Sequence, residues 1–527
     1  MRGFLPIVVA IVLGGGCLPG CGSRAPDQAD RTGPTSTAPN ANSEIPDIST
    51  ELDDEPEPTT PSVTFTPEEH ELAQVDPVAA ELARARRLDS EGRSFSPARN
   101  NAAAVLFGVL QEDPENAQAL ELLDAMLARR IDAAFKAAER GEPKKAEAIL
   151  AGIGKALPDS AAAQLAQVQD AAARLTEMGE QKFAVLRQQF YAITATGDDK
   201  AAEPLFARIE REALREADID AARAELERAR RYGRYAPGQK FNDALQGGGF
   251  GPDMIVVPHG RFEMGTPEGE ANRHKNEGPR HPVRFKRGFA LARTEITVGQ
   301  FRAFIEATGY KARGGGVRAV VWDEKGGAMV ERRGVDWEDD YTGRKAAPDA
   351  PVLYVTWDDA RAYAEWLSQA SGARYRLPSE AQFEYALRAG STTAYPWGGS
   401  VVPPTVSENL TGEKDVSPRG RRFGNVFKGY GDGHWGPAPV GSFAANAFGL
   451  HDMNGNVAEW VEDCWHDNYT RAPSDGSAWV NPGCAKRVIR GASWATAPDQ
   501  ARSGFRLDAK AGTRNARLGF RVARDLR

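Results

Sequence analysis

Residues 449–460 read GLHDMNGNVAEW and lie in the part of the chain that decides its fold. From residue 253 to the C-terminus the composition departs from the rest, since all ten tryptophans lie after position 320. Short β-branched runs at 254–257 and 283–285 stand between loops. Helical spacing of apolar residues is limited to three pieces, at 297–307, 356–371 and 379–389. We therefore expect an irregular domain of short strands, few helices and long loops that aromatic packing or bound ions hold together.

The whole chain has 527 residues, more than one ordinary domain. It carries 66 Lys and Arg against 73 Asp and Glu, a formal charge of -7, which gives no support for nucleic-acid binding. Only four cysteines are present, and Cys17 and Cys21 lie at the N-terminus. This count excludes a disulfide-dense scaffold and a four-cysteine zinc site.

The first 21 residues have the pattern of an export signal. Arg2 precedes a ten-residue apolar run at 4–13, which is too short to cross a bilayer core of about 30 Å. Small residues and Cys21 follow, in the order Leu18-Pro19-Gly20-Cys21. This pattern resembles a bacterial lipoprotein signal, which implies that Cys21 is lipidated and anchors the chain to a membrane. Cys17 stays open as the lipidated residue, and a plain secretory signal or an uncleaved anchor is the alternative.

Residues 22–66 are rich in Pro, Ser, Thr and acidic residues and poor in large apolar ones. They hold nine acidic and two basic residues, so the whole formal charge of the chain resides here. Such a composition cannot bury enough apolar surface to offset the entropy of ordering. We expect a disordered spacer that reaches roughly 35–40 Å from its anchor, with an acidic docking segment as the alternative.

Residues 68–236 are dominated by good helix formers. Gly and Pro occur mainly at 113–116, 141–143 and 157–160, where helices are expected to begin or end. We expect helices at 144–156, 164–178, 179–195, 199–215 and 217–232. The Asp-Pro-Glu-Asn-Ala start resembles tetratricopeptide repeats, although Pro114 and Pro158 stand 44 residues apart where that family keeps about 34. The interpretation is a repeat-like helical domain that binds a protein partner, and a helical spacer or oligomerisation bundle is the alternative.

Eight motifs of the remaining segment occur in the order of a known family. They are FEMGT (262–266), EITV (295–298), PV with VTW (351–357), RLPSEAQFE (376–384), YPWG (395–398), GLHDMNGNVAEW (449–460), RGASW (490–494) and GFRV (519–522). Together they resemble the sulfatase-modifying-factor domain, the family of the formylglycine-generating enzyme, over 245–527. The resemblance implies an irregular α+β fold related to C-type lectins.

Formylglycine-generating enzymes of this family oxidise a cysteine with copper(I) held by two cysteines set five residues apart. The matching positions here are Thr496 and Ala501, and neither offers a thiolate. Other family members are iron-dependent sulfoxide synthases with a His-x3-His-x-Glu motif, and none of the seven histidines has that spacing. His274, Glu277 and His281 cluster, and we interpret them as a solvated loop before a strand, with metal binding as the alternative. We therefore expect no catalytic residues of the copper type.

Calcium is the cofactor that the resemblance implies. Family members hold Ca2+ with backbone carbonyls and oxygen side chains, which suit a hard cation. The residues that match a first site are Asn454, Gly455, Val457 and Glu459, with Glu459 as the carboxylate ligand. The residues for a second site are Asn409, Leu410, Asp432 and His434.

The residues expected to line the family's cleft are Ser493, Trp494, Arg502 and Arg506, which offer stacking and anion binding. Cys464 and Cys484 do not fall at the copper positions. In an exported domain we expect them to form one disulfide around a loop of about 20 residues, with a free thiol or a metal pair as the alternative.

Two functions remain open. The first is a membrane-tethered, non-catalytic binding or regulatory module of the bacterial cell envelope, facing the periplasm. Gly22 after Cys21 is not the Asp that favours inner-membrane retention in some bacteria, so the outer membrane is the favoured location. The second is an iron-dependent oxidase of the same family that modifies an exported peptide or small molecule.

Overall fold

The computed structural model describes residues 76–213, 215–312 and 317–527. The signal segment, Cys17, Cys21 and the acidic spacer lie outside the described residues, so the predictions made for them stay predictions. None of the described helices is long and apolar enough to cross a membrane.

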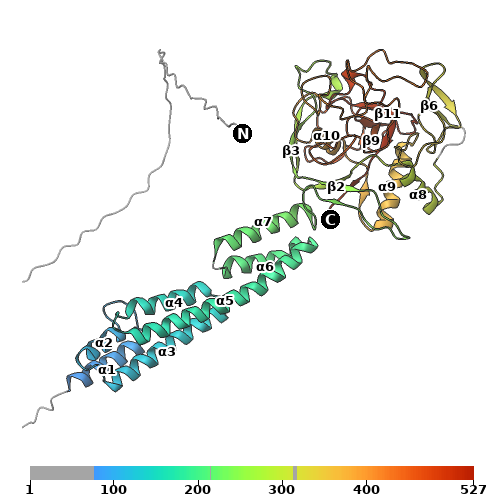
Figure 1. Cartoon of the computed structure of the whole chain (residues 1–527). Helices are drawn as coiled ribbons and strands as arrows, with labels where there is room; N and C mark the ends of the chain where they lie inside the picture. The colour runs from blue at the N-terminus through green and yellow to red at the C-terminus, as the bar shows by residue number, and fades with distance from the viewer. Residues whose placement is uncertain (1–75, 214, 313–316) are drawn as a thin grey trace, which may run out of the picture. The chain divides into compact units, whose positions relative to one another are not determined.

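Seven helices are described before residue 236, and neighbours in the chain run antiparallel (Figure 1). They are α1 (Pro77–Ser90), α2 (Ala102–Glu112), α3 (Ala117–Glu139), α4 (Pro143–Ala156), α5 (Ala162–Thr196), α6 (Asp199–Glu212) and α7 (Glu216–Tyr232). One hydrophobic cluster joins α1 to the first half of α5, and a second joins the rest of α5 to α6 and α7. The helical interpretation of this region is confirmed.

One predicted boundary in this region is wrong. We expected a break between residues 178 and 179, but α5 runs through both as a single helix of 35 residues. Gly179 lies inside it, where a glycine costs about 1 kcal/mol against alanine. Because α5 carries Leu175 in one hydrophobic cluster and Leu186 in the other, packing along both halves outweighs that local cost.

The C-terminal domain is built on two sheets. The five-stranded sheet has the order β1 (Lys240–Phe241), β2 (Met254–Val257), β5 (Phe289–Ala292), β13 (Ala523–Arg524) and β8 (Tyr375–Arg376). The four-stranded sheet has the order β11 (Leu507–Lys510), β10 (Lys486–Arg490), β9 (Ala458–Cys464) and β12 (Leu518–Phe520). Every pairing in them is antiparallel except β9 with β12. β1 begins upstream of residue 245, where we expected this domain to start.

Two separate hairpins and three helices complete the domain (Figure 1). The hairpins are β3 (Gly260–Met264) with β4 (His281–Phe285), and β6 (Arg318–Asp323) with β7 (Ala328–Arg333). The helices are α8 (Val298–Thr308), α9 (Trp357–Ser371) and α10 (Glu380–Arg388). Each begins at a capping box, formed at Thr297, Thr356 and Ser379. These caps explain why the three predicted helices begin where the sequence indicated.

The two sheets bury most of their residues, and long loops carry the rest of the domain. The main hydrophobic cluster holds large aromatic side chains from α8, α9 and β9, among them Phe301, Tyr363 and Trp460. Trp460 is fully buried, and its indole nitrogen donates a hydrogen bond to the Val355 carbonyl at 3.0 Å. Aromatic packing of this kind fixes loops that have few backbone ladders of their own.

Candidate functional site

The loop 449–460 turns sharply before it becomes β9. Asp452 and Asn456 have φ angles of 55° and 60°, in the left-handed region that Asn and Asp tolerate better than most residues. The Asn456 side chain donates to Glu295 Oε1 at 3.1 Å and accepts from Asn409 Nδ2 at 3.2 Å. The turn thereby brings three segments that are distant in the sequence to one buried place.

Glu459, in β9, forms a buried ion pair with Arg521. Arg521 donates from Nε and Nη2 to the Glu459 carboxylate at 2.7 to 2.9 Å. Both side chains are 0% exposed. Arg521 also donates to the carbonyls of Ala292 and His451. Burial raises the pKa of Glu459, and the Arg521 guanidinium acts against that rise.

Three further acidic side chains lie near this ion pair: Glu295, Glu408 and Asp452. None of them forms a salt bridge within the described residues. Burial, with the Asp452 carboxylate as the next cause, raises the pKa of both Glu295 and Glu408 well above the usual range. Together with Glu459, four carboxylates therefore surround one arginine, and the cluster lacks positive charge.

Several oxygens of this cluster are buried and have no hydrogen-bond partner. They are Glu295 Oε2, Glu408 Oε2, Asp452 Oδ1 and Asn454 Oδ1. Leaving such atoms unpaired costs free energy, and hard oxygen donors are the ligands that Ca2+ prefers. These oxygens are of the donor type that would suit a calcium ion, and calcium binding here stays a prediction.

The four residues predicted for the first calcium site lie in or beside this cluster, and their side chains make different contacts. Asn454 contributes one of the unpaired oxygens, and Gly455 and Val457 follow it in the same loop. Glu459 already holds Arg521. No group of three or more His, Cys, Asp or Glu side chains that could hold a metal occurs in the described part of the chain. A calcium ion here would thus draw on amide and backbone oxygens as well as carboxylates.

The second predicted set is also brought together. Asp432 accepts hydrogen bonds from the backbone nitrogens of Leu410 at 2.8 Å and His434 at 2.9 Å. Burial raises the pKa of Asp432 to about 7. Asn409 has a buried, unpaired Oδ1 and lies against Asn456 of the first cluster. This set therefore offers one oxygen that lacks a partner, and its role in calcium binding stays a prediction.

Thr496 and Ala501, which match the copper positions, are held by structural contacts, among them a hydrogen bond of 2.8 Å from Thr411 Oγ1 to the Thr496 carbonyl. Thr496 Oγ1 accepts a hydrogen bond from the Ser493 nitrogen and lies 2.9 Å from Ser493 Oγ. Ala501 is 0% exposed, and its carbonyl accepts a hydrogen bond from Asn454 Nδ2 at 2.7 Å. Neither position carries a soft ligand for Cu(I).

Trp494 and the two predicted cleft arginines are buried. The Trp494 indole nitrogen donates to the Ala516 carbonyl at 3.1 Å. Arg506 donates to Glu380 Oε2 at 2.7 Å, and its guanidinium lies 4.4 Å from the centre of the Trp465 ring. Since these side chains are held by internal partners, binding of an external ligand by them stays a prediction.

Arg502 explains a further difference from the sequence analysis. Both of its terminal nitrogens donate to Glu277, at 2.7 and 2.6 Å, and Glu277 is 0% exposed. The interpretation of 273–281 as a solvated loop is therefore wrong at Glu277. The ion pair buries this carboxylate, whereas His274 remains exposed.

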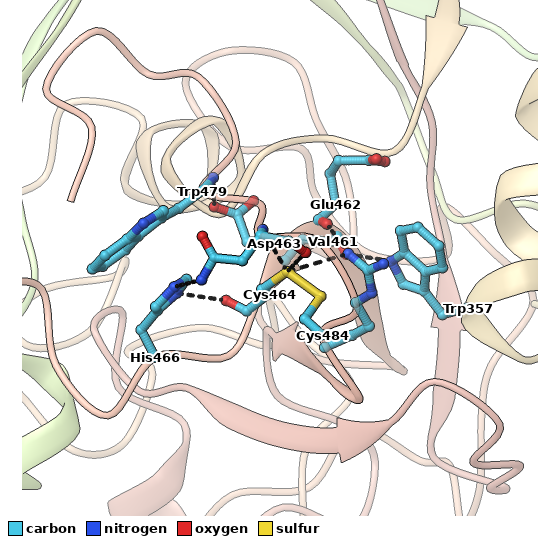
Figure 2. Close-up of a disulfide and its surroundings, with 10 residues drawn as sticks. Trp357, Val461, Glu462, Asp463, Cys464, His466, Trp479 and Cys484 are labelled. Carbon is cyan, nitrogen blue, oxygen red and sulfur yellow. Dashed lines mark hydrogen bonds between the residues drawn. A yellow bond between two sulfur atoms is a disulfide. The ribbon is translucent and has the colours of Figure 1, made fainter.

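Cys464 and Cys484 form a disulfide, as expected (Figure 2). Their Cα atoms lie 5.8 Å apart, within the ordinary range for such a bond. The bond fixes the loop between β9 and β10, in which the His466 ring stacks on Trp479 with ring centres 3.6 Å apart (Figure 2). All cysteines of the described residues are therefore used in structure.

Comparison with known proteins identifies the C-terminal domain. Residues 244–526 match the family model of the sulfatase-modifying factor enzyme 1-like domain. The chain belongs to this family.

Two curated relatives and one solved structure show how far the family resemblance extends. The formylglycine-generating enzyme of Streptomyces coelicolor is 33% identical over 306 residues, covering 52% of this chain and 89% of that protein. The inactive C-alpha-formylglycine-generating enzyme 2 of Bos taurus is 31% identical, covering 53% and 89%. The structure of PvdO from Pseudomonas aeruginosa is 38% identical, covers 55% of this chain and 99% of that one, and has a TM-score of 0.45.

Sequence reasoning missed Asp452, Glu295 and Glu408 as members of the buried acidic cluster. Asp452 lies two residues before Asn454 in a motif that was already identified. Glu295 and Glu408 each lie in or beside a segment that had been singled out, but nothing local shows that their side chains are buried together. Only their long-range proximity gives them a common role.

Proposed function

We propose that this protein is a binding or regulatory module of the sulfatase-modifying-factor family that does not use the family's copper chemistry. The observation that carries this proposal is the pair Thr496 and Ala501. A hydroxyl and a methyl group stand where copper(I) requires thiolates. Cys464 and Cys484 cannot replace them, because they form a disulfide.

Calcium is the ion that we propose for the domain. The support is the excess of buried carboxylate around Arg521 and the unpaired oxygens of Asp452 and Asn454. Asp452 and Asn454 would hold the ion, together with Glu295 or Glu408. The ion would neutralise charge that burial makes costly, and so hold the 449–460 loop against the segment around Asn409.

The setting of the domain is part of the same proposal. A lipid on Cys21 would tether the chain to a membrane of a bacterial cell envelope, with the outer membrane favoured. The acidic spacer would hold the folded part away from the lipid surface. Helices α1–α7 would dock a protein partner. The tethered chain would then carry both the partner-binding helices and the C-terminal domain.

The second candidate is a metal-dependent oxidase, with iron in place of copper, acting on an exported peptide or small molecule. Its support is the 33% identity to an enzyme that generates formylglycine. Against it, the predicted cleft offers Arg502 and Arg506 in internal ion pairs and no imidazole or thiolate.

Metal content separates the two functions. We would purify the full mature chain without a histidine tag and measure its metals by elemental mass spectrometry. Calcium near one or two equivalents without iron or copper supports the binding module. Stoichiometric iron or copper, with oxygen consumption on exported peptides, would establish the oxidase instead. The Thr496→Cys/Ala501→Cys variant is the matched control, because restored thiolates should increase Cu(I) uptake above that of the natural chain.

A further inference from the structure

A second candidate binding place lies away from the calcium cluster and the copper positions. A cavity of about 320 Å³ opens between the β3–β4 hairpin and α10 with the loop that follows it. Arg261 and Arg280 line it from the hairpin side, and Tyr385 and Phe448 line it from the other. None of the predicted metal, copper or cleft residues contributes to its wall. Its volume is in the range of small-molecule sites.

The charges around this cavity are not balanced within the protein. Arg261 and Arg280 are exposed, and neither forms a salt bridge or a hydrogen bond within the described residues. Arg388 also lines the cavity, but Glu384 holds it at 2.9 Å. Glu263 is the carboxylate of the wall and makes no ion pair in the described structure. The residues that line the cavity thus include two arginines and one carboxylate without an ionic partner, so positive charge is in excess.

The register of the hairpin makes this arrangement costly. Arg261 lies directly opposite Arg284 in the β3–β4 pair. Like charges at directly opposed positions destabilise an antiparallel pair. No carboxylate lies close enough to either arginine to form a salt bridge in the described structure. A costly concentration of positive charge beside a cavity is typical of a surface that binds an anion.

The remaining wall is aromatic. The Phe262 ring lies 5.3 Å from Tyr385, and Tyr385 lies 5.4 Å from Phe448, measured between ring centres. Tyr385 is only 7% exposed, and its hydroxyl makes no hydrogen bond within the described residues. The exposed Thr392 adds another hydroxyl at the rim. The cavity therefore pairs an apolar, ring-sized wall with unpaired hydrogen-bond donors.

We propose that this cavity binds an aromatic carboxylate. Its ring would pack against Phe262, Tyr385 and Phe448, and its carboxylate would pair with Arg261 and Arg280. A carboxylate would offset part of this unbalanced positive charge, and arginine binds carboxylates with charge-assisted, often bidentate, hydrogen bonds. The same chemistry occurs in a free aromatic acid and in the C-terminal aromatic residue of a peptide. The site is independent of calcium and of the copper positions.

Binding of phenylacetate to the full chain, measured by calorimetry or ligand-observed NMR, tests this assignment. Arg261→Gln and Arg280→Gln should each weaken binding about tenfold or more, since each removes one charge-assisted hydrogen bond. Arg287→Gln is the matched control, because Arg287 is an exposed arginine of the same domain that does not line the cavity. Phenethyl alcohol, which keeps the ring without the charge, should bind at least as weakly as the variants bind phenylacetate.

One more ligand distinguishes the two sources of an aromatic carboxylate. Tighter binding of N-acetylphenylalanine than of phenylacetate supports a peptide terminus, whereas the reverse supports a free acid. The assignment is overturned if no aromatic acid binds when the ligand is titrated through the millimolar range, on the order of the weakest specific affinities. It is equally overturned if the neutral alcohol binds as well as phenylacetate, or if Arg287→Gln weakens binding as much as the cavity variants.

Discussion

Arg521 holds both carboxylate oxygens of Glu459 in an ion pair that is shielded completely from solvent. The contact joins the segment 519–522, near the C-terminus, to the last two residues of the 449–460 motif. It also means that Glu459 has a structural task whether or not calcium is bound. An effect of its removal therefore has to be separated from an effect on the ion.

Replacement of Glu459 by Gln should destabilise the protein by about 1.5–3 kcal/mol, because it removes the charged acceptor of the Arg521 hydrogen bonds while Glu295 and Asp452 remain near the guanidinium. The free energy of unfolding, measured by urea titration, should fall by the same amount in calcium and in chelator. Glu331→Gln is the control, since the Arg318–Glu331 pair is exposed and worth about 0–1 kcal/mol. A loss seen only in calcium would show that Glu459 acts mainly as a metal ligand.

Asp452→Asn should separate calcium binding from folding. The change keeps an oxygen for the hydrogen bond from the Gly441 nitrogen and removes one of the clustered negative charges. We expect unchanged or higher stability in chelator and a smaller rise of melting temperature on adding calcium. For the natural chain, calcium at 100 times its Kd should add about 2.7 kcal/mol.

The control for this experiment is Glu306→Gln, which removes an exposed carboxylate of α8. It should leave the response to calcium unchanged. Equal calcium responses in the natural chain and in Asp452→Asn would contradict the proposed role of Asp452.

Loss of the Cys464–Cys484 disulfide should lower the free energy of unfolding by about 3 kcal/mol, as estimated for a closed loop of this size. The sequence separation of the two cysteines is 20 residues. Urea unfolding of the Cys464→Ala/Cys484→Ala variant checks this value. The reduced natural chain should show a similar loss, and adding reductant to the variant should change nothing. A reductant effect in the variant would mean that another bond is involved.

His466 should titrate below its usual range. Burial is the first cause that lowers its pKa, followed by the nearby Arg506 charge. Its Nε2 lies 2.8 Å from the donor Asn481 Nδ2, which favours the neutral ring, whereas the Cys464 carbonyl, 3.0 Å from Nδ1, acts against the lowering of the pKa. The folded-state pKa of His466 is depressed, so the neutral ring contributes to the free energy of unfolding above about pH 6.5. That contribution is lost as pH falls through the folded-state pKa.

An NMR titration of the His466 ring in the folded chain measures this shift, with the histidine signals in concentrated urea as the reference. The folded midpoint should lie below the urea midpoint. In His466→Gln the acid-dependent loss of stability between pH 7 and 5 should be smaller than in the natural chain. A folded midpoint at or above the reference would contradict the arrangement around Trp479.

Much of the fold could be predicted from local patterns. Thr297, Thr356 and Ser379 begin the three domain helices as capping residues, and capping is a short-range interaction that a few neighbouring residues determine. The disulfide was also predictable, since only two cysteines remain outside the N-terminal segment. The continuity of α5 was not, because Gly179 weakens the helix locally and the packing that retains it lies on other helices.

The sequence by itself determined the family, through motifs spread over 262–522, and it determined that Thr496 and Ala501 carry no thiolate. Only the tertiary structure decided which charges meet. It paired Glu459 with Arg521 and Arg502 with Glu277, and it gathered Glu295, Glu408 and Asp452 in one buried cluster. Local sequence patterns act over a few residues, whereas the energy of a buried charge depends on neighbours that chain folding brings from more than 50 residues away.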